Sequence, residues 1–120
     1  MKGKLRNRNE TAYVDVTLKN MHEASFDELV KEAKRKGFLF FPYHVFIDSD
    51  ANVHEGRPLD AVACIDLTEG NEDVLTILVD APVEHLVTDA QRKALQAIVS
   101  TYAPVEVKGV RWNENISLSI

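Results

Sequence analysis

The order of apolar and polar residues along the chain predicts strands that alternate with helices. Runs rich in β-branched and aromatic residues are typical of strands, and the two clearest are residues 11–18 (TAYVDVTL) and 74–79 (VLTILV). The second run is almost continuously apolar, which predicts a central strand buried on both faces. Shorter segments predict further strands at residues 41–47, 53–55 and 105–110, and the alternating tail at 115–120 suits one more edge strand.

Two helices are predicted to begin at capping boxes, in which two side chains satisfy the first free backbone N–H groups. Ser25 with Glu28 begins the first helix, and Thr88 with Gln91 begins the second. Behind each box, apolar residues recur at helical spacing: Phe26, Leu29, Val30 and Ala33 in the first helix, and Ala94, Leu95, Ile98, Val99 and Tyr102 in the second. Gly37 suits the end of the first helix, and Pro104 ends the second.

This order of elements predicts an α/β fold, with a central mixed β-sheet of about five strands flanked by helices. The polar turn at residues 48–52 joins the segments 41–47 and 53–55 into a hairpin, so the sheet is not all parallel. Sparse glycine and proline predict one domain over residues 11–120, preceded by a basic N-terminal segment at residues 1–10.

Composition narrows the possible functions. The chain has 120 residues, 45% of them hydrophobic, and a net charge of -5. No apolar run approaches the roughly 20 residues of a membrane span, and the acidic balance disfavours nucleic acid as a partner. The single cysteine, Cys64, cannot form a disulfide within the chain. With four histidines beside it, the chain offers few soft ligands for a metal.

One string is distinctive: Tyr43-His44-Val45-Phe46-Ile47-Asp48, a turn, and then Val53-His54-Glu55-Gly56-Arg57-Pro58. It resembles the type-2 N-acetylmuramoyl-L-alanine amidase family, which includes the peptidoglycan recognition proteins and small phage lysozymes. The helix ending at Lys36-Gly37-Phe38 and the helix start Thr88-Asp89-Ala90-Gln91 fit the same family. The resemblance covers most of residues 11–110 and implies the amidase fold.

The resemblance also implies a zinc ion with three protein ligands, which polarises the scissile amide and activates water. The position of the first ligand corresponds to Asp15, and that of the second to Val110. The proline-rich segment that carries the third ligand has no counterpart after Trp112. Tyr43, by contrast, matches the family's catalytic or substrate-orienting tyrosine. The sequence therefore predicts a pseudoenzyme that has no metal or other cofactor.

Other catalytic arrangements have little support in the sequence. No pair of histidines has the spacing typical of metal ligands. Cys64 has no obvious base beside it in the sequence, and an inert buried cysteine is the simpler interpretation. Residual amidase activity therefore ranks last among the functions that we consider.

The first functional hypothesis is a binding module that uses the cleft of the amidase scaffold. Its lining residues would be Tyr43, Arg57, Asp15, Lys108 and Arg111. An aromatic ring stacks on a ligand and an arginine fork binds carboxylate or phosphate, so the ligand is predicted to be a muropeptide or a small nucleotide-like anion. Simpler roles stay open: Arg57 could pair with Glu55 or Asp60, Tyr43 could only pack, and Lys108 and Arg111 could form a solvated strand end.

A second hypothesis gives the chain a protein target. Some phage members of the family inhibit an RNA polymerase through their N-terminal region, where this chain carries Lys2, Lys4, Arg6 and Arg8. The resemblance also suggests a phage protein in the cytoplasm of a bacterial host, where it would sequester a host signal molecule and so inhibit host defence. Because Ile116, Leu118 and Ile120 would form an exposed apolar row, we also predict a homo-oligomer.

Overall fold

A computed structural model describes residues 13–38, 41–57, 74–102 and 109–114. For Tyr13, Val74 and residues 101–102 and 109–114, it describes the backbone alone. Several predictions fall outside these ranges: those on the basic segment at residues 1–10, on Cys64, on Lys108 and on the tail at residues 115–120.

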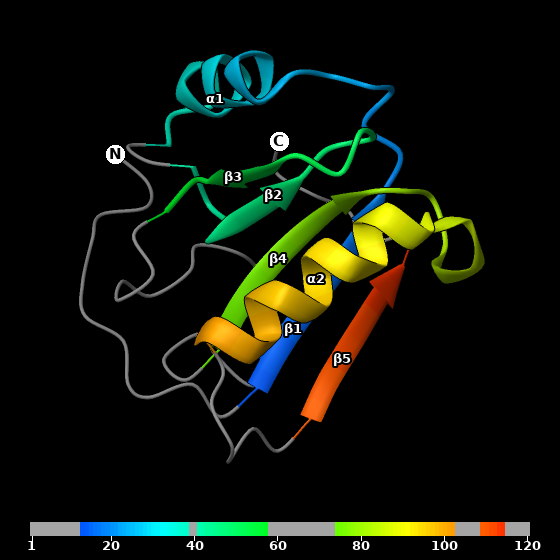
Figure 1. Ribbon diagram of the computed structural model, residues 1–120. Helices are drawn as coiled ribbons and strands as arrows, with labels where there is room; N and C mark the ends of the chain where they lie inside the picture. Colours follow the sequence, from blue (N-terminus) through cyan, green and yellow to red (C-terminus); the bar gives the residue numbers. More distant parts are fainter. Residues whose placement is uncertain (1–12, 39–40, 58–73, 103–108, 115–120) are drawn as a thin grey trace.

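The core of the fold is a five-stranded mixed sheet (Figure 1). Its strands are β1 (Tyr13–Lys19), β2 (Val45–Ile47), β3 (Val53–Glu55), β4 (Val74–Asp80) and β5 (Gly109–Glu114). They lie in the order β3-β2-β4-β1-β5. All neighbours are parallel except β2 and β3, which form the antiparallel hairpin. The predicted α/β class and mixed sheet are confirmed, and so is the central position of β4.

The helices α1 (Phe26–Arg35) and α2 (Asp89–Tyr102) begin at the two predicted caps. Ser25 Oγ accepts a hydrogen bond from the Glu28 N–H at 3.2 Å. At α2 the box is reciprocal: Gln91 Oε1 accepts from the Thr88 N–H at 3.0 Å, and Thr88 Oγ1 accepts from the Gln91 N–H at 3.1 Å. No helix among the described residues is long and apolar enough to cross a membrane.

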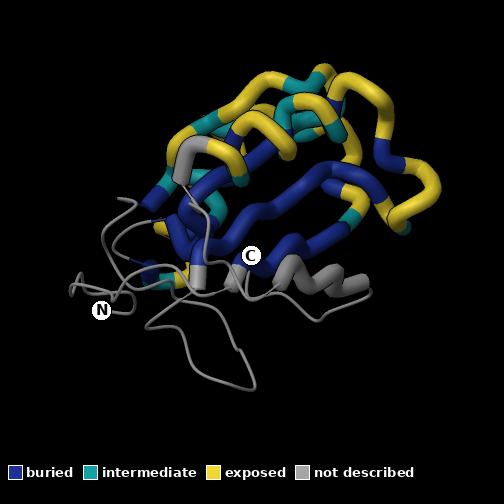
Figure 2. The backbone as a smooth tube through the Cα atoms, turned by 60° about the horizontal axis from the view of Figure 1, so that its bottom comes forward, coloured by how far each residue is buried: buried dark blue, intermediate teal, exposed yellow. Residues whose placement is uncertain are grey.

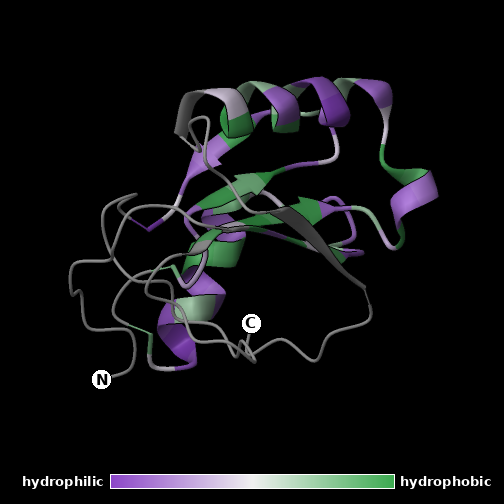
Figure 3. Cartoon of the chain, turned by 90° about the horizontal axis from the view of Figure 1, so that it is seen from below, coloured by the Kyte–Doolittle hydropathy of each residue, from purple (hydrophilic) through white to green (hydrophobic). Residues whose placement is uncertain are grey.

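The two faces of the sheet carry separate apolar clusters. Alternate residues of β1 and β4 pack under α2, together with Val45 and Ile47 of β2; the β1 and β4 residues are Val14, Val16, Leu18, Leu75, Ile77 and Val79. On the other face, Phe46 and Leu78 pack under α1 with Tyr43. Strands β1, β2 and β4 therefore lie largely buried between the two helices, whereas β3 is mostly exposed; the outer sides of the helices are exposed and hydrophilic (Figures 2 and 3).

Two predicted strands have other bounds in the structure. The segment 41–47 is a strand only over Val45–Ile47, because Pro42 has no N–H to donate and the Thr76 N–H of β4 bonds to the His44 side chain instead of a ladder carbonyl. The last strand runs over Gly109–Glu114 rather than 105–110. The second half of this strand is polar, so the apolar pattern does not predict it; an edge strand needs fewer apolar residues than a central one.

Candidate functional site

Tyr43 and Asp15 lie together on the face of the sheet turned away from α2. Asp15 and Thr17 alternate with the apolar residues of β1 and are only 2% and 1% exposed. Tyr43 precedes β2 and is 1% exposed. Burial raises the pKa of Tyr43 far above the usual tyrosine value; the charge of Asp15 adds to this rise, and the Thr17 side chain opposes it. Within the described residues, the Tyr43 hydroxyl has no partner in hydrogen-bonding geometry.

Arg57 is joined to this group through the backbone. After β3 the chain runs back along the segment before β2, so that the Gly56 N–H donates to the His44 carbonyl at 2.9 Å and the Arg57 N–H donates to the Tyr43 carbonyl at 2.8 Å. The Arg57 side chain is 1% exposed. No other Lys or Arg side chain that the structure describes is buried as deeply. Because a guanidinium keeps its charge even when buried, Arg57 places a positive charge inside the protein.

Of the two predicted cations near the last strand, one can be placed. Arg111 lies in the middle of β5, in register with Asp15 on the neighbouring β1. Only the backbone of Arg111 is described, so a solvated side chain at this position stays a prediction, and Lys108 lies outside the described residues. Four of the five predicted ligand-binding residues have a described position; Tyr43 and Asp15 lie close together, Arg57 adjoins Tyr43, and Arg111 adjoins Asp15. Their role in binding stays a prediction.

The residues that the structure describes do not fit the zinc ion implied by the resemblance. Among them, no three His, Cys, Asp or Glu side chains group closely enough to hold a metal ion. His44 Nδ1 accepts from the Thr76 N–H at 3.0 Å, and His54 Nε2 lies 2.9 Å from Asp48 Oδ2. His22 is exposed in the turn after β1, and His85 is exposed in a short 3-10 turn after β4. Two of the described histidines therefore bond to Thr76 and Asp48, and the other two lie beyond the ends of β1 and β4.

A second polar cluster holds the edge at which β1, β2 and β4 end. Gln91 is 1% exposed, and its Nε2 donates at 3.0 Å both to the Asp48 carbonyl and to the Asp80 carbonyl. The Asp80 carboxylate accepts from the Met21 N–H at 2.7 Å and from the Glu23 N–H at 3.2 Å. The sequence predicted Gln91 only as a cap; its links across the fold carry no local signal.

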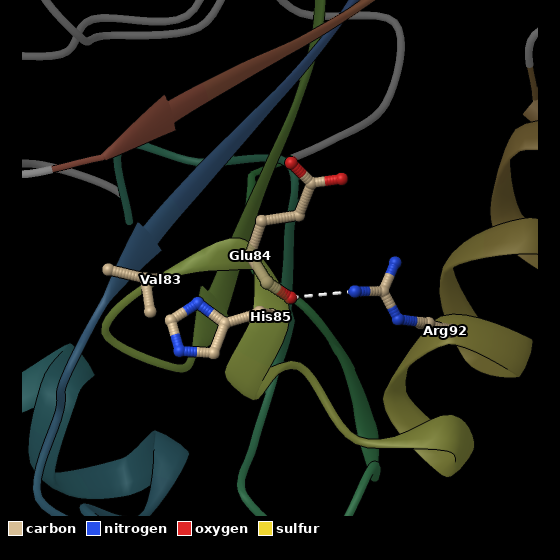
Figure 4. A pocket seen from close by; sticks show the side chains of 4 residues that line it. All are labelled: Val83, Glu84, His85 and Arg92. Atoms are coloured by element: carbon tan, nitrogen blue, oxygen red, sulfur yellow. Dashed lines mark hydrogen bonds between the residues drawn. The ribbon is translucent and has the colours of Figure 1, made fainter.

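A pocket of about 470 Å³ lies beside this edge, between the 3-10 turn η1 (Glu84–Leu86) and α2. It is lined by Val83, Glu84, His85 and Arg92. Arg92 Nη2 donates to the Glu84 carbonyl at 2.6 Å, and the His85 ring lies on the other side of that carbonyl (Figure 4). None of the predicted ligand-binding residues lines this pocket.

Comparisons with known proteins support the fold. No model of a protein family and no curated protein matches the sequence. Among solved structures, the chain is similar to the N-acetylmuramoyl-L-alanine amidase LysC from Clostridium intestinale, with a TM-score of 0.75, 15% identity, and 97% of this chain and 80% of that chain covered.

Peptidoglycan recognition proteins are similar to a comparable degree. For the Drosophila protein SD, the TM-score is 0.71 at 17% identity, over 92% of this chain and 74% of that chain. For the complex of the proteins LCa and LCx with tracheal cytotoxin, the TM-score is 0.69 at 15% identity, over 92% of this chain and 75% of that chain. The chain therefore has the mixed α/β fold of N-acetylmuramoyl-L-alanine amidases and peptidoglycan recognition proteins.

Proposed function

We propose that this chain is a non-catalytic binding protein that holds a muropeptide on the sheet face around Tyr43. The observation that carries the proposal is the Tyr43 hydroxyl, which is buried beside Asp15 and Thr17 and makes no hydrogen bond of good geometry among the described residues. Because native proteins satisfy most buried polar groups, such a hydroxyl calls for a functional explanation. A bound ligand that accepts its hydrogen bond provides one.

The chemistry of the face suits a muropeptide. The Tyr43 hydroxyl can donate to an amide carbonyl, and the Asp15 carboxylate can accept from a sugar hydroxyl or a peptide N–H. One solved complex of the same fold holds tracheal cytotoxin, which supports this ligand over the nucleotide-like anion that the sequence also suggests. Phage origin, a host cytoplasm, a protein target and a homo-oligomer stay predictions of the sequence.

The absence of catalysis is part of the proposal. The amidase reaction of this fold requires a metal with one open position, and the described residues supply no group of three ligands. Tyr43 alone can orient a carbonyl but has no Lewis acid to share the developing charge. The face is therefore suited to binding rather than to cleavage.

Access to the site implies a conformational difference. Tyr43 and Asp15 are 1% and 2% exposed, so a ligand that contacts them requires a state in which this face is open. An affinity measured on the whole chain then includes the free energy of that opening. We accordingly expect slow association, below the rate of a preformed surface site.

The test combines affinity with stability. We expect tracheal cytotoxin to raise the melting temperature of the chain and to bind by calorimetry, with the same affinity in EDTA and without hydrolysis of the amide bond. Tyr43→Phe should weaken binding about tenfold. The same change should leave the protein as stable or stabilise it by about 1–2 kcal/mol, because a buried hydroxyl without a partner costs desolvation free energy.

The matched control is Tyr102→Phe in α2, which should keep the wild-type affinity. A flat thermal response to muropeptides would refute the proposal. If nucleotides stabilise the chain and muropeptides do not, the ligand class is wrong. Amide hydrolysis that EDTA abolishes would show that the chain is an enzyme.

A further inference from the structure

We infer that His44 and Thr76 are positioning residues for the Tyr43 side chain: together they interrupt strand β2 and so turn Tyr43 onto the face that carries Asp15. The function of that face rests on the proposal above, but the positioning itself does not. The inference comes from the alternation of side chains along β2 and from three hydrogen bonds between His44 and Thr76.

Side chains along a strand alternate between the two faces of the sheet. Phe46 packs in the cluster under α1, and its neighbours Val45 and Ile47 pack in the cluster under α2. If β2 continued regularly toward its N-terminus, Tyr43 would lie on the same face as Val45. It lies instead in the cluster of Phe46, three residues away, with its hydroxyl close to Asp15 and Thr17. The alternation is therefore broken between Tyr43 and Val45.

The break falls on His44. In the β2–β4 register, Val45 pairs with Ile77, so a regular strand would set His44 beside Thr76 and continue the ladder there. The His44 backbone N–H donates instead to Thr76 Oγ1 at 3.1 Å, and the Thr76 backbone N–H donates to His44 Nδ1 at 3.0 Å. Thr76 Oγ1 also lies 3.1 Å from His44 Nδ1. Side chains have thus taken the place of ladder bonds on both strands.

Both residues are completely buried, so these bonds are made out of contact with water. Because Nδ1 accepts from a backbone N–H, the ring carries its proton on Nε2. Loss of either side chain would leave a buried backbone N–H without its acceptor, and an unsatisfied buried donor costs desolvation free energy. The alternative available to the chain is to extend the regular strand to His44, and this would carry Tyr43 to the other face of the sheet.

The arrangement acts as a β-bulge does when it redirects a side chain near a functional site. The Gly56 N–H bond to the His44 carbonyl and the Arg57 N–H bond to the Tyr43 carbonyl hold the same segment from the hairpin side. These bonds use backbone atoms and do not select the face on which Tyr43 lies. The selection comes from His44 and Thr76.

The experiment follows Tyr43 directly in the full chain. Fluorotyrosine incorporated at the three tyrosines gives separate fluorine NMR signals, and the Tyr43 signal is assigned by its loss in Tyr43→Phe. In the wild type this signal should titrate above the range of an ordinary tyrosine. In Thr76→Val, which keeps the shape but lacks the hydroxyl, and in His44→Leu, it should move and titrate closer to that range.

Conservative variants supply the controls. Thr76→Ser keeps the hydroxyl, and His44→Asn keeps an acceptor near the place of Nδ1, so both should retain the wild-type Tyr43 signal. Ile98→Val, in the cluster under α2, should lower stability without moving the signal. If His44→Leu fails to fold, the pair Thr76→Val and Thr76→Ser decides. An unchanged Tyr43 signal in a folded Thr76→Val variant would overturn the inference.

Binding separates this inference from the proposed function. Thr76→Val should lower the affinity for tracheal cytotoxin at least tenfold, and Thr76→Ser should bind it with the affinity of the wild type. If the wild type binds no muropeptide while the Tyr43 signal responds as expected, the proposed function fails and the positioning stands. If the ligand binds equally well to the wild type and to Thr76→Val while their Tyr43 signals differ, the positioning stands and its link to binding is refuted.

Discussion

Gly56→Ala tests the close packing of the hairpin against the segment that carries Tyr43. A Cβ atom at position 56 would lie 2.5 Å from Phe41 Cδ2, 3.1 Å from Phe41 Cγ and 2.9 Å from the Tyr43 carbonyl oxygen. The two shorter distances are well below ordinary van der Waals contact, and one of them involves backbone. The added methyl group can therefore be accommodated only if the two segments move apart.

The size of the effect follows from two opposing contributions. Forced overpacking in a buried region costs about 1–3 kcal/mol. The backbone of Gly56 is not in the left-handed region, so alanine also gains about 0.4–1 kcal/mol through the lower entropy of the unfolded chain. We expect a net loss of about 1–2 kcal/mol in the free energy of unfolding. For a chain of this length, that lowers the melting temperature by about 3–8 °C.

Gly37→Ala is the matched control. Gly37 has φ +91° and no atom within 4 Å of an added Cβ, so its cost is backbone strain of about 1 kcal/mol. Urea unfolding followed by circular dichroism should show both variants destabilised. Only Gly56→Ala should also move the Tyr43 fluorine signal, because it displaces the Tyr43 carbonyl that accepts from Arg57. A Gly56→Ala protein as stable as the wild type would refute the packing argument.

Two further predictions concern the edge at which the parallel strands end. Gln91→Ala should lower the free energy of unfolding in urea by about 2–4 kcal/mol, because it removes the amide that donates to two backbone carbonyls and accepts from the Thr88 N–H. Gln96→Ala, at an exposed position, should change stability little. Equal effects of the two changes would contradict this account. Burial acts to raise the pKa of Asp48, but hydrogen bonds from His54 and two backbone N–H groups lower it overall. The stabilisation from Asp48 is therefore complete above the usual aspartate pKa and is lost as pH falls through the lower pKa of the folded state. Asp48→Asn should accordingly flatten the acid side of the curve of unfolding free energy against pH. An unchanged acid side would disprove this prediction.

The sequence predicts the elements whose signals are local. Capping boxes at Ser25 and Thr88 and the apolar run of β4 depend on residues within one turn or one strand, and the structure has all three. The break in β2 could not be predicted in this way. The string FPYHVFI has the composition of a strand, and only the distant Thr76 shows that His44 leaves the ladder. A bond between residues 32 positions apart has no local pattern.

In the candidate site, too, local features could be predicted from the sequence and features that depend on distant residues could not. That Tyr43 and Asp15 share one face followed from the resemblance to a known fold, not from any spacing between them. Composition does not predict that both are almost completely buried, because tyrosine is often partly exposed and aspartate is mostly exposed in folded proteins. The role of Gln91 was half predicted: its cap is local, whereas its bonds to the Asp48 and Asp80 carbonyls depend on how the strands are ordered.

The contrast between the two sides of β1 is the strongest physical reason to regard this face as functional. Val14, Val16 and Leu18 fill the side under α2 with apolar atoms, while the same strand buries Asp15 and Thr17 on the other side to the same depth. A buried carboxylate and hydroxyl contribute less to stability than valine or leucine would, since their desolvation must be offset by partners. Stability alone would therefore favour apolar residues on both sides. The polar side is consistent with the proposed ligand, which would accept the hydrogen bond of the Tyr43 hydroxyl, and if it does, Tyr43→Phe will stabilise the free protein and weaken the complex.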